Sequence, residues 1–453
     1  MTTTTVAPFE VSAFATHYLP HFDEILACFF FWNFPHPDFV GADEAPIEFY
    51  NAGRKTFDGQ YATETWVRTH RKIALGIWQS EFDEHRREGE TDEEYEARRE
   101  KQECASFLVA KRLGLEELPE FRAILRFARR VDNTATADPR DISSVIKRLH
   151  DNREAKPHLV SKYVKDPSKL ARIMELISRQ ISLGDMFLWV EQGIYAKYLE
   201  DPTDSKVDDF TVDRIGELLR LQGSEEAEGN EYSAEEWLQI GTDALELDQL
   251  MFETVVAAEY AKYKVLVPFR GKNKKGEVVD LKIAFVPSDV EGIHRRARFE
   301  DHVAVTIQRR SNGTVVIQSN KYYNIKMYDV ARIIKTVEHE LRGLEPPRWD
   351  EMKRELLHSV WHYFQKGEAL FNGSKTAPDT DPTRIPILKL VGLVKLGLSV
   401  EVFEPSRSET CLQGICSSTK SRPCPWYKYG LSRCQTIRWE ARRDREAEAG
   451  AGK

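Results

Sequence analysis

Four side chains that could bind a metal ion stand close together near the start of the chain. The stretch "THYLPHFDEILACFFFW" contains His17, His21, Asp23 and Glu24, directly before one of the most apolar segments of the sequence. Apolar residues on both sides indicate that the stretch is buried, and buried imidazoles and carboxylates need partners. Of these four, we take His17, His21 and Asp23 as candidate metal ligands.

Two later stretches supply further acidic and imidazole groups. In "SEFDEH", Asp83 and His85 follow a predicted strand and would point to the same side of an extended backbone. At 100° per residue, Asp132 lies about 20° from Phe121 around the helix predicted for residues 119–131, and therefore on its buried face. A carboxylate on a buried face is unfavourable unless a cation meets it.

If these side chains converge, either protonation or a divalent cation must relieve the repulsion among their charges. Two carboxylates roughly 4 Å apart repel by about 4 kcal/mol at an effective dielectric constant near 20. Mixed imidazole and carboxylate ligation suits Mn²⁺, Zn²⁺ or Fe²⁺ better than Mg²⁺ or Ca²⁺. An ion held in this way lowers the pKa of bound water and stabilises displacement at phosphorus, and two ions do so best. The alternative is that the histidines are core residues bonded to backbone groups and that Asp132 marks a helix end.

The elements that would position these residues indicate an α/β fold. The hydrophobic pattern predicts a strand, a helix and two further strands, at residues 9–16, 22–34 and around Ile47 and Ile73. The ends of such strands line ligand crevices in α/β sheets. Helices are predicted across residues 151–221. Alternating strands follow residue 263, with a hairpin turn at Asn312 and Gly313.

The motif spacing resembles the DHH phosphoesterase superfamily. Three stretches over roughly residues 9–135 carry the resemblance: His17-x3-His21-x-Asp23, then Asp83-Glu84-His85, then Asp132 in "VDN". The stretch "THYLPHFDEILAC" is most similar to the branch that contains the melanocyte-proliferating-gene exonucleases. The resemblance implies an N-terminal, mainly parallel sheet flanked by helices. It also implies metal ligation by His17, Asp23, Asp83 and Asp132, with His21 and His85 as ligands or as contacts to the scissile phosphate.

The function that the resemblance implies is a metal-dependent phosphodiesterase. We expect a nuclease or exonuclease that uses one or two Mn²⁺ ions and water to cleave nucleic acid or short oligonucleotides. The alternative is a non-catalytic protein that binds metal and nucleic acid, and the missing strand-end aspartate favours it. Three departures from the family pattern are present, one of which is Glu84 at the middle DHH position. Gly76 stands near the strand end where the family has an aspartate, and a glycine-rich GGGH-type motif is missing.

Four cysteines crowd into the C-terminal region, at positions 411, 416, 424 and 434. Four thiols in a short segment suit a structural Zn²⁺ site, although an iron–sulfur cluster or unliganded cysteines are also compatible with this spacing. Eight lysines and arginines between Lys420 and Arg445 alternate with aromatic residues, which is the composition of a surface for single-stranded nucleic acid. A small cap whose aromatic rings pack inward is the alternative.

Length and charge set the remaining expectations. A chain of 453 residues is too long for one ordinary core, so we expect three parts. These are a metal-binding catalytic domain with a helical extension (1–222), a mixed α+β substrate-positioning domain (223–345) and a region with a Cys-rich module (346–453). The net charge of −8 gives no general preference for nucleic acid or membranes. The sequence shows no signal peptide and no apolar run of membrane-spanning length, so we expect a cytoplasmic protein without a membrane partner. A homodimer is compatible with the sequence.

Overall fold

The computed structural model describes most of the chain, and its contacts divide it into two compact units. The described residues are 8–51, 64–78, 80–84, 90–91, 94, 97–98, 101, 103–134, 137–200, 209–224, 226–345, 360–364, 367–375, 377, 380–400, 410, 416, 424, 427 and 429–451. One unit comprises Met1–Val255 with Lys375–Asp379, and the other Val256–Ser374 with Thr380–Lys453. Each unit is described by itself.

A parallel three-stranded sheet organises the start of the first unit. Its order is β4 (Ile47–Tyr50), β2 (Ala13–His17) and β5 (Lys72–Ala74), and β2 pairs in parallel with both neighbours. A separate parallel pair joins β1 (Phe9–Glu10) to β3 (Phe39–Val40). The α/β class and the predicted order of strand, helix and two strands are confirmed.

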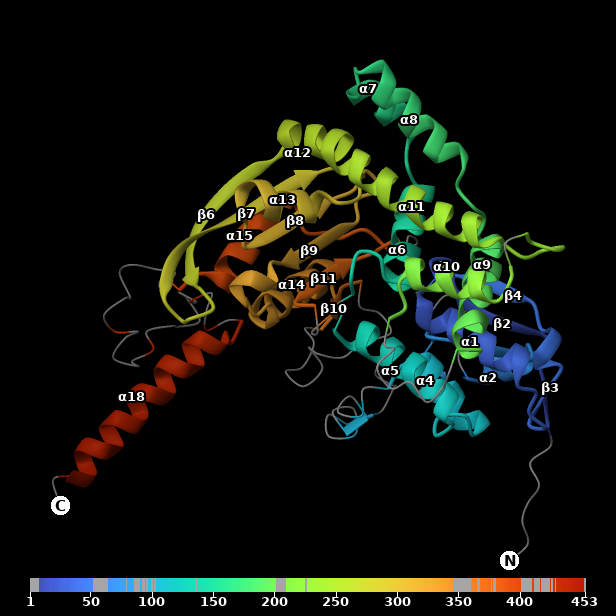
Figure 1. The fold of residues 1–453 in the computed structure, drawn as a ribbon. Coiled ribbons are helices and arrows are strands. Elements are labelled where there is room, and N and C mark those ends of the chain that lie inside the picture. The colour runs from blue at the N-terminus through green and yellow to red at the C-terminus, as the bar shows by residue number, and fades with distance from the viewer. Residues whose placement is uncertain are drawn as a thin grey trace, which may run out of the picture. The chain divides into compact units, whose positions relative to one another are not determined.

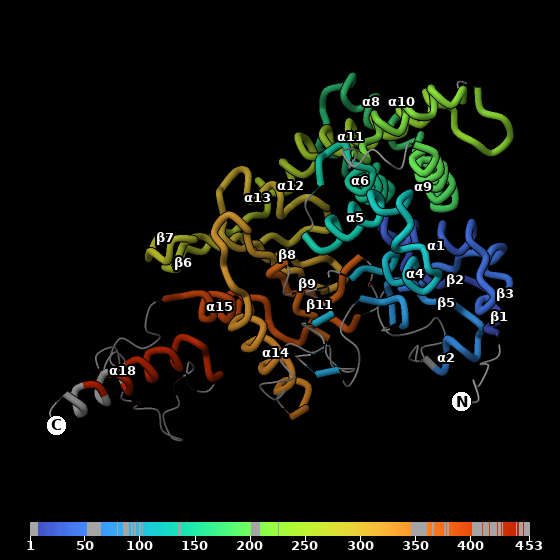
Figure 2. The backbone as a smooth tube through the Cα atoms, turned by 60° about the horizontal axis from the view of Figure 1, so that its bottom comes forward, coloured from blue at the N-terminus to red at the C-terminus, as the bar shows by residue number. Residues whose placement is uncertain are grey.

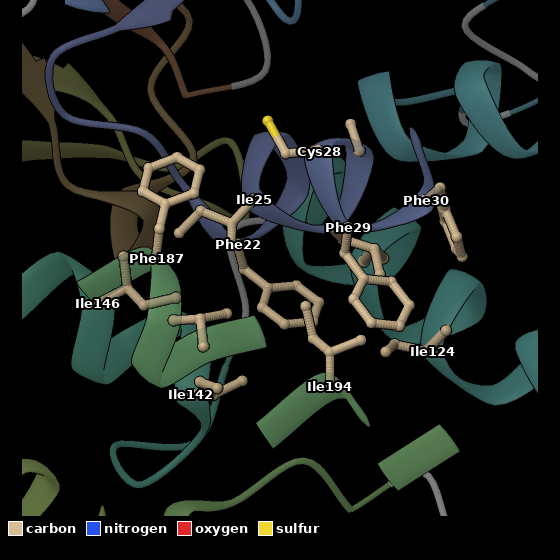
Figure 3. Close-up of a cluster of buried hydrophobic side chains, with 14 of the residues drawn as sticks. Phe22, Ile25, Cys28, Phe29, Phe30, Ile124, Ile142, Ile146, Phe187 and Ile194 are labelled. Carbon is tan, nitrogen blue, oxygen red and sulfur yellow. The ribbon is translucent and has the colours of Figure 1, made fainter. Parts of the chain in front are cut away.

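Helix α1 (Phe22–Asn33) forms the centre of the first hydrophobic core. Every residue from Phe22 to Phe31 is buried, as expected of a helix that is apolar on all sides. The ring of Phe14 of β2 packs at a tilt against that of Phe31, with 5.3 Å between ring centroids, and this contact holds α1 on one face of the sheet. Figure 3 shows the opposite packing, with side chains of α1 directed toward Ile142, Ile146 and Ile194.

Further helices complete the first unit (Figure 1). Their bounds are η1 (Ala42–Glu44), α2 (Glu64–Thr69), α4 (Ala105–Leu113), α5 (Pro119–Thr134), α6 (Ile142–Arg153), α7 (Pro157–Tyr163), α8 (Pro167–Ser178), α9 (Leu183–Tyr198), α10 (Val212–Leu221) and α11 (Ala234–Met251). The helical prediction for 151–221 and the helix predicted at 119–131 are confirmed. Helix α2 packs on the sheet face opposite α1, where Trp66 and Val67 contact a small cluster of Ala15, Tyr50 and Trp78.

The second unit contains a mixed six-stranded sheet. Its order is β10 (His362–Phe364), β11 (Ala369–Asn372), β9 (Val315–Ser319), β8 (Val305–Arg309), β7 (Val278–Pro287) and β6 (Val265–Lys272). Strands β7 and β8 are parallel, and the other neighbours are antiparallel. Gly313 has φ +86°, which confirms the predicted hairpin turn between β8 and β9. Strands β10 and β11 were not predicted, because their short apolar runs lack a clear alternation.

Helices cover both faces of the six-stranded sheet, as Figure 2 shows. The helices of the second unit are α12 (Ala257–Tyr263), α13 (Ile293–Asp301), η3 (Lys321–Tyr323), α14 (Tyr328–Arg342), α15 (Ile387–Leu398) and α18 (Ser432–Ala451), and residues 252–255 of η2 (Phe252–Val256) belong to the first unit. Apolar residues of α14 and α15 form one core with Ile283, Ile307 and Ile317 of the sheet. Within the described part of the chain, no helix has both the length and the apolarity needed to cross a bilayer.

Candidate metal site

The junction between β2 and α1 positions the polar cluster found in the sequence. His17 is the last residue of β2, at the carboxyl edge of the parallel sheet, and His21 is the N-cap of α1. Glu24 occupies the third position of the helix, and its Oε2 accepts a hydrogen bond of 2.7 Å from the backbone N–H of His21. This bond is one half of a capping box and fixes the first turn of the helix.

His17, His21 and Glu24 form the candidate metal site. Among the described residues, they are the one group of three or more potential metal ligands whose donor atoms all lie within 4.8 Å of one another. His17 Nε2 lies 3.3 Å from Glu24 Oε1, and His21 Nδ1 lies 3.9 Å from Glu24 Oε2. The side chains of His17 and Glu24 are 6% and 8% exposed, whereas that of His21 is 62% exposed. Two of the three side chains, His17 and Glu24, are therefore buried, and solvent reaches the site at His21.

The charge of Glu24 is stabilised inside the fold. Burial acts to raise the pKa of Glu24, but the charge and hydrogen bond of His17, together with the charge of His21, lower this pKa to about 2. The second ring nitrogen of His17, Nδ1, is buried and has no hydrogen-bond partner among the described residues. The site thus holds an ionised carboxylate beside an imidazole with unused hydrogen-bonding capacity.

Gly76 closes one side of the site against Glu24. Its φ is +64°, and a Cβ built on Gly76 would lie 2.6 Å from Oε1 of Glu24. Only glycine combines this backbone conformation with such a close approach. The carboxylate of Glu24, which extends from α1, therefore closely approaches the backbone of Gly76.

Asp23 points away from the group and caps a different helix. Its Oδ2 accepts a 2.7 Å hydrogen bond from the N–H of Ala105, and its Oδ1 accepts hydrogen bonds from both the N–H and the hydroxyl of Ser106. Cys104, the N-cap residue of α4, makes no capping bond of its own. The structure therefore gives Asp23 a capping contact, and its metal ligation stays a prediction.

Loss of this cap should weaken α4. We expect Asp23→Ala to destabilise the first unit by about 1–3 kcal/mol, because buried N–H groups lose their acceptor. Hydrogen exchange measured by mass spectrometry should accelerate across α4. The matched control is Asp166→Ala, which removes the exposed local cap of α8. Equal, small effects of both substitutions would contradict the capping role of Asp23.

The charges of Glu24 and Asp132 affect the pKa of Asp23. Burial raises the pKa of Asp23 to about 7, with the charges of Glu24 and Asp132 adding to the effect and hydrogen bonds from Cys104 and Ser106 opposing it. Asp132 lies near the end of α5 and is half-buried. Its electrostatic effect means that Asp132 lies near Asp23, although it is not part of the group around Glu24.

Asp83 is buried beside the strand end that carries Gly76. Leu75 and Phe82 form a parallel bridge, and the N–H of Gly76 donates to the carbonyl of Phe82. Asp83 follows directly and is 2% exposed. The structure therefore brings Asp83 to the same edge of the sheet, without placing it in the group of three. His85 lies outside the described residues, so its predicted role stays a prediction.

His150 of α6 supports the turn that precedes His21. Its Nε2 forms a 2.7 Å hydrogen bond with the carbonyl oxygen of Pro20, and the residue is 3% exposed. Burial lowers the pKa of His150 to about 4; the bond to Pro20 opposes this effect, and the charges of His21, Arg153 and His17 add to it. Sequence analysis did not single out His150, because its packing partner lies 130 residues away.

The lowered pKa of His150 predicts a pH-dependent stability. Between the ordinary pKa of 6.5 and the folded value of about 4, the unfolded chain binds more protons, so stability falls as the pH drops through this window. The full loss is about 3 kcal/mol. We expect His150→Gln to lose this contribution, so that the stability difference between wild type and variant shrinks between pH 7 and pH 4.5 in urea unfolding.

The control for this measurement is the exposed His158 on α7. We expect His158→Gln to change stability little at either pH, because its side chain has few contacts to lose. A wild-type and His150→Gln difference that is constant with pH would contradict the assignment. Asp23 is present in both proteins, so its own titration cancels in the comparison.

The cysteine cluster is described only in part. Cys411 lies outside the described residues, Cys416 is exposed, and Cys424 and Cys434 are partly buried. The last two pack against the core of the second unit, and Cys434 lies in α18. The predicted Zn²⁺ site at Cys411, Cys416, Cys424 and Cys434 stays a prediction.

Glu24 is the site residue that sequence reasoning missed as a ligand. A signal was present, because His21 and Glu24 have the three-residue spacing of a capping box. That spacing turns the Glu24 side chain back toward the end of β2. The adjacent Asp23 is turned about 100° further around the helix, toward α4.

Comparison with known proteins adds little to this geometry. No protein-family model matches the chain, and no curated protein matches it. Among solved structures, one described as "Crystal structure of an uncharacterized protein from Helicobacter pylori G27" aligns over 85% of this chain and 98% of its own chain, at 8% sequence identity and a TM-score of 0.20. So weak a likeness indicates neither fold nor function.

Proposed function

We propose that this protein is a metal-dependent phosphodiesterase that hydrolyses nucleic acid or short nucleotides. The observation that carries the proposal is the group of two imidazoles and one carboxylate at the carboxyl edge of a parallel sheet. Such edges are where α/β folds bind ligands. The resemblance of the surrounding motifs to DHH phosphoesterases supports phosphodiester hydrolysis as the reaction class.

The donor set fits a divalent transition metal. His17, His21 and Glu24 offer two nitrogens and an oxygen, which suits Mn²⁺ and excludes the all-oxygen shell typical of Mg²⁺ or Ca²⁺. Three protein ligands with an open side are typical of catalytic rather than structural metal sites. The buried Nδ1 of His17 and the exposed side of His21 agree with this type of site. Asp83, His85 and Asp132 are the proposed source of a second set of ligands.

We assign the roles of the site residues from the solvent exposure of their side chains. A bound divalent ion would supply Lewis-acid stabilisation and a more acidic water molecule. His17 and Glu24 are buried and fixed, so they hold the geometry. His21 is the ligand that solvent reaches, so we assign it the contact with the non-bridging oxygens of the substrate phosphate. Gly76 leaves room for the side chain of Glu24, and His150 holds the turn through its hydrogen bond with the carbonyl of Pro20.

Hydrolysis of bis-p-nitrophenyl phosphate and of a labelled oligonucleotide tests the proposal. Wild-type protein freed of metal with a chelator should be inactive and should regain activity when Mn²⁺ is added. The His17→Ala variant should remain inactive after Mn²⁺ is added. Elemental analysis of protein purified without added metal should also find Mn, with Zn if the cysteine site is real. A wild-type protein that releases no product with any of Mn²⁺, Zn²⁺ or Fe²⁺ would refute catalysis.

One observation favours a second candidate, a metal-binding and nucleic-acid-binding protein without turnover. Gly76 leaves the strand end without the aspartate that the resembled family has, so the site has one carboxylate fewer. In this case Mn²⁺ would bind with the same dependence on Glu24, but no substrate would be cleaved. The hydrolysis assay above therefore separates the two candidates.

A further inference from the structure

The first half of helix α18 in the second unit carries an unusual set of exposed side chains. Arg438, Trp439, Arg442 and Arg443 are all exposed, and Trp439 is 60% exposed. Basic side chains interleaved with exposed aromatic rings are the composition of a surface for single-stranded nucleic acid. Figure 1 shows α18 extending away from α14 and α15 toward the C-terminus.

These four residues lie on one side of the helix. At 100° per residue, Arg438, Arg442, Trp439 and Arg443 fall within a sector of about 140°. Ile437 lies on the opposite side and packs against the core of the second unit. The packing of Ile437 against the core therefore determines that the side of α18 with Arg438, Trp439, Arg442 and Arg443 faces outward.

The start of α18 is anchored, which fixes this face relative to α14. Asp329 of α14 accepts hydrogen bonds from the N–H and the hydroxyl of Ser432. Arg332 of α14 donates a hydrogen bond to the carbonyl of Gly430. The N-terminus of α18 is thus already occupied by a carboxylate of the same chain. The exposed face lies in the following turns and is a separate feature.

Rings and guanidinium groups alternate along the face. Arg438 lies over the ring of Tyr427, 5.6 Å from its centroid, and Arg443 lies over the ring of Trp439 at 5.1 Å. Tyr427 is itself 50% exposed. The aromatic rings therefore point outward, and the alternative of a cap with inward-packed aromatics does not hold for Tyr427 and Trp439.

The two halves of α18 differ in net charge, and the first half is basic. Residues 432–443 contain four arginines and one glutamate, whereas residues 444–451 contain one arginine and three acidic residues. The basic half coincides with the exposed aromatic residues. A membrane-binding helix would instead need a wide apolar face, and Trp439 is the large apolar side chain that the described part of α18 exposes most.

We propose that the face formed by Tyr427, Arg438, Trp439, Arg442 and Arg443 binds single-stranded nucleic acid. Guanidinium groups pair with phosphates, and exposed rings stack on bases, which is the recognition used for single strands without sequence preference. This surface would bind independently of the metal site. It gives the protein a means of holding a strand that the three-residue site alone lacks.

Fluorescence anisotropy of the full-length protein with a fluorescein-labelled 20-nucleotide poly(U) strand, without added metal, tests the proposal. Trp439→Ala should weaken binding roughly tenfold, because one base loses its stacking partner. The triple variant Arg438→Gln, Arg442→Gln and Arg443→Gln should reduce the slope of log K against log salt by about 2. Circular dichroism should show that both variants remain folded, since the replaced side chains are exposed.

A charge-matched control uses three half-exposed arginines of the first unit. Arg112→Gln, Arg140→Gln and Arg220→Gln together remove the same charge without touching α18, and should leave binding within about twofold. The proposal is overturned if the two triple variants bind poly(U) equally, if wild type does not bind, or if the α18 variants lose binding only to phosphatidylserine vesicles. Hydrolysis of bis-p-nitrophenyl phosphate should be the same in the α18 variants, so failure of the surface is distinguishable from failure of the active site.

Discussion

Glu24→Gln should abolish divalent-metal binding with little change in the fold. The substitution keeps the size of the side chain and an amide oxygen that can still accept from the N–H of His21. It removes the negative charge that the structure holds between His17 and His21. Loss of a charged ligand should weaken Mn²⁺ binding by about 100-fold or more, since even indirect changes around a metal cost 10- to 100-fold.

Isothermal titration calorimetry with Mn²⁺ measures this effect, and Mn²⁺-dependent hydrolysis should disappear in parallel. Glu259→Gln is a suitable control, because Glu259 is also buried and hydrogen-bonded but belongs to the second unit. We expect that control to bind Mn²⁺ as tightly as wild type. Unchanged Mn²⁺ affinity in Glu24→Gln would show that the group around Glu24 is a hydrogen-bonded core feature and not a metal site.

Gly76→Ala should disrupt the same site by a steric clash and not by removing a charge. The new Cβ would lie 2.6 Å from Oε1 of Glu24 and 3.1 Å from its Cγ, so the carboxylate must move. The positive φ of Gly76 adds about 1–2 kcal/mol of backbone strain for any other residue. We expect a loss of stability of roughly 3 kcal/mol in urea unfolding and a loss of Mn²⁺ binding comparable to that of Glu24→Gln.

Gly114 provides a matched control for the backbone contribution. It has φ +73° at the end of α4, and no atom lies within 4 Å of a Cβ built on it. Gly114→Ala should therefore cost the strain alone, about 1–2 kcal/mol, and leave metal binding unchanged. If the two glycine substitutions have equal effects on stability and on Mn²⁺ binding, the close approach of Gly76 to Glu24 contributes to neither.

The sequence predicted the elements well, because local pattern determines them. The short apolar segment that contains β2 and the unbroken apolar run of α1 identify a buried strand and a buried helix without long-range information. The junction between them, which carries His17 and His21, follows from the same pattern. The α/β class and the hairpin at Gly313 were predictable for this reason.

The roles of individual acidic residues could not be predicted in the same way. Asp23 and Glu24 are adjacent in sequence and equally capable of binding a metal. Their different contacts are decided by Ala105 and Ser106, which are more than 80 residues away. Pattern and spacing give the face of a helix on which a residue lies, but not the partner that a distant segment presents to that face.

The capping of α4 by Asp23 ties the order of assembly to the candidate site. The hydrogen bond from Ala105 closes a loop of 82 residues, so it forms only when the start of α4 meets the first turn of α1, and the entropic cost of closing the loop grows slowly with its length. The amide protons of Ala105 and Ser106 therefore report when the two ends of this loop meet. In pulse-labelling experiments during refolding, their protection should mark the moment at which the first turn of α1, with Glu24 in it, becomes fixed.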